Sequence, residues 1–391
     1  MIVTHRPSTD PASAGFDLDA LDVLRDKVRA QVDGGRMPAC QLAFGADGEL
    51  AVFESYGTAT NDTHFVVFSA TKALIAGVVW QLFAEGTLSA HTRVIELVPR
   101  FGQEGRTPEW MAAVTVEQLL THTSGFPYAP LGPPRWDTRE GRIDVFARWH
   151  ATFEPGTHFE YHPTAAHWVL AELIECTEGR DYRYVVNDRI IGPLGLHHLA
   201  FGPAAAELDD VADLEVVGEP ATMEELSELF GQFDPALLGE VTPDALLGFN
   251  DRGIRGVGVP GAGAVATAAD FALLYQHLLH DPTGRWDPQL LVDATRTIRC
   301  ELPNMIGVPA NRSLGLVVAG DDGLARFRGM GPTVSPSTFG HNGAAGQIVW
   351  ADPASGLSFC LLTSGVDAHV LREARRIVSL AAAAGRCRPP R

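Results

Sequence analysis

FSATK, at residues 68–72, stands at the start of a long apolar run. Hydrophobic residues recur at helical spacing over 70–85, and the run stops at Gly86, which predicts a helix there. A short strand-like segment precedes it. Ser69 is therefore expected at a strand-to-helix junction, and Lys72, three residues later, is expected on the same helix face.

This spacing suits nucleophilic catalysis. A serine hydroxyl attacks only when a neighbouring base takes its proton, and a lysine can be that base when burial or a nearby cation lowers its pKa. The helix N-terminus also favours a developing anion at Ser69. The alternative is structural: Ser69 caps the helix and Lys72 lies on the surface.

The composition is ordinary for a globular enzyme. Of 391 residues, 46% are hydrophobic and 20% are charged, and the length favours two packed lobes. The net charge of −18 argues against nucleic acid and against a polybasic membrane contact. The sequence does not indicate an oligomeric state.

The N-terminal segment, residues 1–15, is polar and has no apolar core followed by a cleavage site, so no secretory signal is expected. No run reaches the ~20 apolar residues that span a bilayer. The cysteines are scattered and form no C-x-x-C pair: Cys40, Cys176, Cys300, Cys360 and Cys387. Reduced thiols in a cytoplasmic protein are the expectation.

Strand patterns cluster at the two ends of the chain, and helical patterns fill the middle. Helices are predicted at 17–32, 164–178, 223–230, 267–279 and 368–384, and a capping box at 115–118 opens a short one; strands are predicted at 40–44, 50–56, 314–318, 346–351 and 357–363. The expected fold class is α+β, an antiparallel sheet flanked by terminal helices with an inserted all-helical lobe. Residues 1–68 plus 260–391 would form the α/β lobe and 69–259 the helical lobe, with the active site between them.

Two further segments carry candidate chemistry. Tyr161 follows a Pro-Gly turn and precedes a helix, and a tyrosine near a lysine can shuttle a proton. HNG, at 341–343, is a glycine-flanked polar insertion before an apolar strand, and the N–H groups of Ala344 and Ser69 could hold an oxyanion. Alternatively, Tyr161 is a half-buried structural tyrosine and 341–343 a tight turn.

Other site types are excluded by their context. His158 and His162 have metal-ligand spacing, but Pro163 interrupts a helix there, so neither a metal nor a cofactor is expected. The segment 256–261 matches a dinucleotide fingerprint by letter but contains a proline and lacks a preceding strand. No G-x-S-x-G elbow is present, which argues against an α/β-hydrolase.

In chain order, SATK, Tyr161 and HNG together resemble the serine β-lactamase and penicillin-binding-protein superfamily. The likeness is to the class C-like branch, which includes carboxylesterases, D-amino-acid peptidases and acyltransferases. Supporting segments run from about residue 18 to 380 and are LLTHTSGF (119–126), EPGTHFEY (154–161), IIGPLGLHHLAFG (190–202), PGAGAVATAADFALL (260–274) and FGHNGAAGQIVWADPASGL (339–357). The family fold agrees with the α+β pattern above.

The resemblance implies a role for each matching residue. Ser69 would be the acylated nucleophile, Lys72 its general base, and Tyr161 the residue that relays a proton to the leaving group. The backbone N–H groups of Ser69 and Ala344 would form the oxyanion hole. The substrate-binding positions would be His341, Asn342, Gly343 and His162.

Two departures from the family pattern bear on the substrate. The family's Tyr-x-Asn motif appears here as Tyr161-His162-Pro163, so Pro163 replaces the asparagine and His162 occupies the middle position. His341 replaces a lysine that helps to bind the carboxylate of β-lactams and peptides. Each lost partner costs a substrate that needs it about 1–3 kcal/mol. Poor penicillinase activity is therefore expected.

The leading hypothesis is a serine esterase that acts on a small ester through an acyl-Ser69 intermediate. The first alternative is an acyltransferase, in which an alcohol or amine acceptor takes the acyl group instead of water. Hydrolysis of an amide, a β-lactam or a D-amino-acid peptide ranks lower. A non-catalytic binding protein on the same scaffold would usually have lost Ser69, Lys72 or Tyr161, and all three are present.

Overall fold

The computed structural model describes residues 7–230 and 241–390. Residues 1–6 of the N-terminal segment and residues 231–240 of the acidic segment 203–250 lie outside the described part. None of the helices in the described part is long and apolar enough to cross a membrane.

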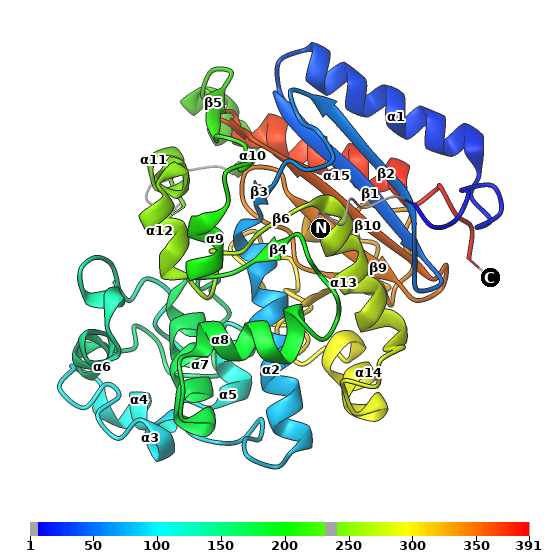
Figure 1. The fold of residues 1–391 in the computed structure, drawn as a ribbon. Coiled ribbons are helices and arrows are strands. Elements are labelled where there is room, and N and C mark those ends of the chain that lie inside the picture. The colour runs from blue at the N-terminus through cyan, green and yellow to red at the C-terminus, as the bar shows by residue number, and fades with distance from the viewer. Residues whose placement is uncertain (1–6, 231–240, 391) are drawn as a thin grey trace.

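A six-stranded antiparallel sheet forms one side of the described molecule (Figure 1). Its order is β2-β1-β10-β9-β8-β7, with bounds β1 Ala39–Ala46, β2 Glu49–Gly57, β7 Val317–Val318, β8 Phe339–Gly340, β9 Ile348–Asp352 and β10 Leu357–Thr363. The β1–β2 hairpin turns at Asp47 and Gly48, both with positive φ, as the sequence suggests. Strand β1 also pairs with β10, so the two ends of the chain meet at the centre of the sheet.

Helices cover both faces of this sheet. On one face, α1 (Leu18–Asp33) and α15 (Val370–Ala384) pack against alternate β1 residues such as Leu42 and Phe44. On the other face, α13 (Ala268–His280) packs against Ala43 and the residues facing the helical part. This alternation follows from the two-residue period of a strand.

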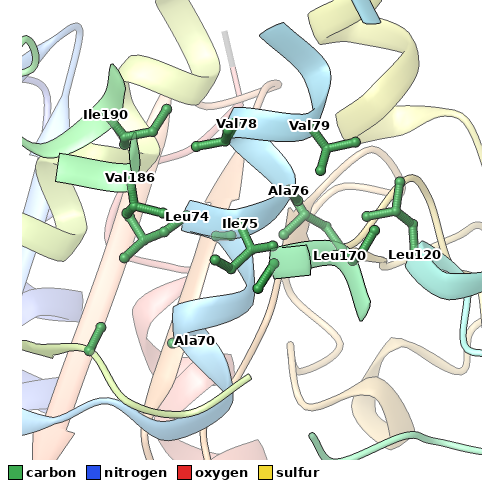
Figure 2. Close-up of a cluster of buried hydrophobic side chains, with 14 of the residues drawn as sticks. Ala70, Leu74, Ile75, Ala76, Val78, Val79, Leu120, Leu170, Val186 and Ile190 are labelled. Atoms are coloured by element: carbon green, nitrogen blue, oxygen red, sulfur yellow. The ribbon is translucent and has the colours of Figure 1, made fainter. Parts of the chain in front are cut away.

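The centre of the helical part is α2 (Lys72–Ala84), which is apolar and buried on all sides. Figure 2 shows its side chains, among them Leu74, Ile75 and Val78, facing Leu120, Leu170 and Val186 from neighbouring helices. A helix without a polar face is stable only inside a core. Burial on every side therefore holds the N-terminus of α2, which carries Lys72, in a fixed position.

The remaining described helices surround α2 or cover the sheet edge. They are α3 Val94–Leu97, α4 Pro108–Ala113, α5 Val116–Leu120, α6 Arg139–Arg148, α7 Ala165–Glu178, α8 Tyr182–Val186, α9 Pro203–Glu207, α10 Met223–Phe230, α11 Pro243–Leu247, α12 Arg252–Val257 and α14 Pro288–Arg296. Two small sheets join the parts. One has the order β3-β6-β4, from β3 Phe65–Val66, β6 Val265–Ala266 and β4 Leu199–Ala200, and the other pairs β5 Glu215–Val217 with β11 Gly365–Asp367.

The α+β class with an antiparallel sheet and terminal helices is confirmed, as is the capping box at Thr115 and Gln118. The predicted strand over 314–318 is wrong for most of its length, because only Val317–Val318 is a strand. Gly315, with φ of +104°, turns the chain away from extended geometry there. The predicted helix over 70–85 begins at Lys72, and Ser69 lies in a 3₁₀ turn, Phe68–Thr71.

Candidate active site

The 3₁₀ turn at the start of α2 presents Ser69 and Lys72 to each other. Lys72 Nζ lies 3.1 Å from Ser69 Oγ, and the lysine side chain is fully buried, whereas Ser69 retains partial exposure. Phe68, the residue before the serine, has a φ of 46°, which is unusual for a bulky side chain. Its ring packs edge-on against Phe249, so tertiary packing maintains this backbone conformation.

Two backbone carbonyls complete the surroundings of Lys72. Its Nζ donates to Pro163 O and to Gly261 O, each at 2.8 Å. A neutral amine has two N–H groups and one lone pair, so these two carbonyls can take both hydrogens and leave the lone pair facing Ser69 Oγ. Gly261 is required for this approach, because a Cβ there would lie 2.8 Å from Pro163 O and 3.3 Å from Lys72 Nζ.

Tyr161 completes a three-residue hydrogen-bonded group. Its hydroxyl donates to Ser69 Oγ at 2.8 Å, which leaves the serine hydrogen free to point at the Lys72 lone pair. Lys72 Nζ also lies 5.2 Å from the centre of the Tyr161 ring. The structure thus brings Tyr161 together with Ser69 and Lys72, although 92 positions separate Ser69 from Tyr161 in the sequence.

Burial and neighbouring charges shift the pKa values of Lys72 and Tyr161. Desolvation lowers the pKa of Lys72, because the buried site disfavours an ammonium ion. Burial alone would raise the pKa of Tyr161, but the positive charges of Lys72 and Arg312 outweigh it and the pKa of this phenol is lowered. A lysine that is easily neutralised and a tyrosine that is easily ionised are suited to proton transfer near neutral pH.

The segment 341–344 lies against the chain just before Ser69. A Cβ on Gly343 would be 2.2 Å from Val67 O, so this glycine allows the segment to touch the chain two residues before the serine. The N–H groups of Ser69 and Ala344 have no acceptor among the described residues. Their role as an oxyanion hole at the partly exposed serine stays a prediction.

His341 is buried and has a partner at each ring nitrogen. Its Nδ1–H donates to Asn342 O at 2.9 Å, and its Nε2 accepts from Arg312 Nη1 at 3.1 Å. Burial and the Arg312 charge hold the pKa of His341 well below its usual value, so the ring is neutral. Its centre lies 6.0 Å from that of the Tyr161 ring.

The other two predicted substrate-binding side chains have internal partners. His162 is fully buried: its Nε2 accepts from Phe126 N–H at 3.2 Å, lies 3.0 Å from Ser124 Oγ, and its Nδ1 donates to Glu160 O at 2.6 Å. Asn342 donates to Gly329 O and accepts from Val349 N–H, each at 3.0 Å. These contacts fix the segments on either side of the site, and they leave substrate contact by His162 or Asn342 as a prediction.

Sequence reasoning missed two residues that contact Tyr161. His122, in the middle of the LLTHTSGF segment, places its ring centre 4.6 Å from that of Tyr161. Arg312 places its guanidinium carbon 5.3 Å from the same ring centre. His122 stands in a segment that carried the family resemblance, whereas Arg312 has no local pattern around it that would distinguish it. Within the described residues no cluster of histidine, cysteine or acidic side chains is arranged to hold a metal ion.

Comparison with known proteins agrees with this geometry. The family model described as Beta-lactamase matches residues 24–384. The chain belongs to the beta-lactamase family. Within this family it resembles the esterase/beta-lactamase LipL of Mycobacterium tuberculosis, with 26% identity over 317 residues that cover 77% of this chain and 69% of LipL. Esterase EstB of Burkholderia gladioli is 28% identical over 243 residues, which cover 55% of this chain and 60% of EstB.

The fold is shared with solved beta-lactamase-like structures. A penicillin-binding protein homologue from Caulobacter crescentus superimposes with a TM-score of 0.74 at 25% identity, and the match covers 94% of this chain and 97% of that one. Family membership and fold are thus established over nearly the whole chain, whereas the matched part spans less than two thirds of EstB.

Proposed function

We propose that this protein is a serine hydrolase that acts through an acyl-Ser69 intermediate, with a small carboxylic ester as its substrate. The observation that carries the proposal is the placement of Ser69 Oγ, 3.1 Å from the buried Lys72 Nζ and 2.8 Å from the Tyr161 hydroxyl. Neither a surface lysine nor an isolated structural tyrosine would have this arrangement.

The proposed reaction has two halves. Neutral Lys72 takes the proton of Ser69 Oγ as this oxygen bonds to the ester carbonyl carbon, and the N–H groups of Ser69 and Ala344 stabilise the resulting oxyanion. Tyr161 then gives its proton to the leaving alkoxide as the C–O bond breaks, and the Lys72 ammonium returns a proton to the phenolate. In the second half, Tyr161 and Lys72 take a proton from water as it attacks the acyl group, and Ser69 Oγ regains its hydrogen.

Several features support an ester rather than an amide or β-lactam. The relative EstB is named as an esterase, and LipL is named as an esterase/beta-lactamase. His341, at the position of the family's lysine, is neutral and its Nε2 already accepts from Arg312, so it does not offer a cation to a substrate carboxylate. An ester needs fewer fixed polar partners, because its leaving group departs more easily than an amine. Amide, D-amino-acid peptide and β-lactam hydrolysis therefore rank below ester hydrolysis.

The alternative is acyl transfer to an alcohol or amine. The same intermediate serves both reactions, and the outcome depends on whether water or a second substrate reaches the acyl group first. A non-catalytic binding role ranks lower, because Ser69, Lys72 and Tyr161 are all retained in hydrogen-bonded positions. The cytoplasmic location and the division into lobes 1–68 plus 260–391 and 69–259 stay predictions.

The test is to treat the purified protein with a short-chain p-nitrophenyl ester and with a fluorophosphonate, and to measure intact mass. We expect one adduct per chain, mapped to Ser69 and absent in Ser69→Ala and Lys72→Ala. Alcohols or amines added with the ester would then yield new esters or amides if the protein is an acyltransferase. Absence of both adduct and turnover would reject the hydrolase proposal in favour of a binding role. A Ser69→Ala variant that keeps its activity would reject the acyl-Ser69 intermediate.

A further inference from the structure

Arg312 is a buried cation without an acidic partner. Arg312 is 8% exposed, and no carboxylate of the described residues lies within salt-bridge distance of its guanidinium. Its Nε has no hydrogen-bond partner in the described part of the chain. Burying an arginine charge without an anion costs free energy, which indicates that the buried charge of Arg312 has a role in the site.

The guanidinium lies against the residues that surround the reacting serine. Its carbon is 5.3 Å from the centre of the Tyr161 ring and 5.6 Å from that of Phe159, and Nη1 donates to His341 Nε2 at 3.1 Å. Buried Arg376 and Arg142, by contrast, are paired with Asp367 and Glu175, although buried Arg255 donates to backbone carbonyls instead. Two ionisable groups interact with the Arg312 charge, Tyr161 and Cys300. Burial raises the pKa of Cys300, whereas the pKa of Tyr161 is lowered, so the Tyr161 hydroxyl is the group that becomes negative more readily.

The remaining groups around Tyr161 cannot replace this charge. Lys72 approaches from α2 and is an ammonium ion when Tyr161 loses its proton, but it then gives a proton to the phenolate, so its charge is transient. His122 packs on the Tyr161 ring, and burial holds its pKa well below the usual value, as it does for His341. His162 and His167 lie beyond His122 and are also held neutral by burial. Arg312 is therefore the permanent charge that faces the tyrosine from the described elements packed against it.

We propose that Arg312 is a positioning residue that stabilises Tyr161 as a phenolate when its proton passes to the leaving group, and that fixes His341 in the tautomer with hydrogen on Nδ1. The inference rests on the proposed function, because it assigns a partner to the proton relay. The proton moves from Tyr161 Oη to the leaving alkoxide oxygen, and the negative charge left on Oη is opposed by the guanidinium.

The dependence on the leaving group tests this role. p-Nitrophenolate leaves without a proton, whereas ethoxide needs one, so loss of the Arg312 charge should harm the ethyl ester more than the p-nitrophenyl ester of the same acid. For Arg312→Met we expect the fall in kcat/KM to be at least about tenfold larger for the ethyl ester. Arg312→Lys keeps the charge and should restore most of the difference. Equal losses on the two esters would mean a structural role and would overturn the proposal.

A spectroscopic titration gives a second measurement that needs no turnover. The ultraviolet difference between wild type and Tyr161→Phe isolates one of the six tyrosines. Its ionisation midpoint should lie below the ordinary value of about 10 and should rise by about one unit or more in Arg312→Met. The matched control is Arg328→Met, which removes a buried arginine that is paired with Asp322 and should leave the midpoint unchanged.

The two measurements separate the inference from the proposed function. If no ester is hydrolysed but the Tyr161 midpoint moves with Arg312, the hydrolase proposal fails and the electrostatic role of Arg312 stands. If esters are hydrolysed and the midpoint does not move, the inference alone is rejected. Should Arg312→Met not fold, a wild-type midpoint at or above about 10 still rejects it.

Discussion

At the scale of the residue, the missing side chain of Gly343 lets segment 341–344 approach the backbone two residues before Ser69. A Cβ on Gly343 would lie 2.2 Å from Val67 O, which is backbone and cannot rotate away. In Gly343→Ala the segment must therefore shift, and the Ala344 N–H moves with it. We expect kcat/KM for a p-nitrophenyl ester to fall by about 10²-fold, because a displacement of roughly 1 Å in a catalytic group has that effect.

The matched control is Gly132→Ala, since a Cβ at Gly132 would meet no atom within 4 Å and the residue's φ is not positive. This variant should keep wild-type activity. Fluorophosphonate labelling of Ser69 should likewise be slower in Gly343→Ala than in wild type and unchanged in Gly132→Ala. Unchanged turnover in Gly343→Ala would show that the Ala344 N–H is not part of the oxyanion site.

The residues that the sequence could predict are those whose chemistry depends on local spacing. Ser69 and Lys72 are three positions apart on one turn, so their proximity follows from the helical pattern. Arg312 approaches Tyr161 through a hydrogen bond to His341, 29 positions away, and nothing near it in the sequence indicates that its charge would be unpaired. Substrate contact by His162 stays a prediction, and the sequence did not indicate that Phe126 N–H and Glu160 O would be the partners of its two ring nitrogens.

At the scale of the element, the N-terminus of α2 is tied to the strand that follows the glycine-rich segment. Thr71 is fully buried, and its Oγ1 accepts from Ala264 N–H at 3.0 Å, next to β6. Thr71→Val keeps the shape but leaves this N–H without an acceptor. We expect the free energy of unfolding, measured by urea denaturation, to fall by about 1–3 kcal/mol.

Thr87→Val, just beyond the C-terminus of α2, is the matched control. Thr87 is exposed and its hydroxyl donates to Leu82 O, a carbonyl that still accepts from the N–H groups of Thr87 and Leu88 in its absence. The change there should be within about 0.5 kcal/mol. Equal effects at the two positions would mean that the Thr71 hydrogen bond contributes no more than a surface contact.

Element boundaries were predictable where capping chemistry is local. Thr267 accepts from Asp270 N–H at the start of α13, in agreement with the sequence pattern. The start of α2 was not predictable, because Phe68 has a positive φ that no local residue preference favours and that contact with Phe249 maintains. The sequence placed the strands from both ends of the chain in one sheet, but the register that pairs Cys40 of β1 with Thr363 of β10 was not predictable, because no local pattern determines it.

At the scale of the whole molecule, the core surrounding the site contains histidines that stay neutral. Burial lowers the pKa of His122, His162, His167 and His341, that of His162 to about 3. An unfolded histidine takes up a proton near pH 6.5, whereas these folded ones do not. Each therefore contributes stability that is present above about pH 6.5 and is lost as the pH falls below it. Glu373, whose pKa is raised to about 7, acts in the opposite direction.

His167 allows this contribution to be isolated, because neither of its ring nitrogens has a hydrogen-bond partner among the described residues. His167→Leu removes one proton uptake by the unfolded chain and leaves the other titrating groups in place. The free energy of unfolding of the variant minus that of wild type should be about 2 kcal/mol more favourable at about pH 5 than at about pH 7.5. Denaturant unfolding at both pH values measures this difference. His91→Gln, at an exposed histidine, should run parallel to wild type. If His167→Leu also runs parallel, His167 is protonated in the folded protein, and the positive charge around Tyr161 is then shared with Arg312.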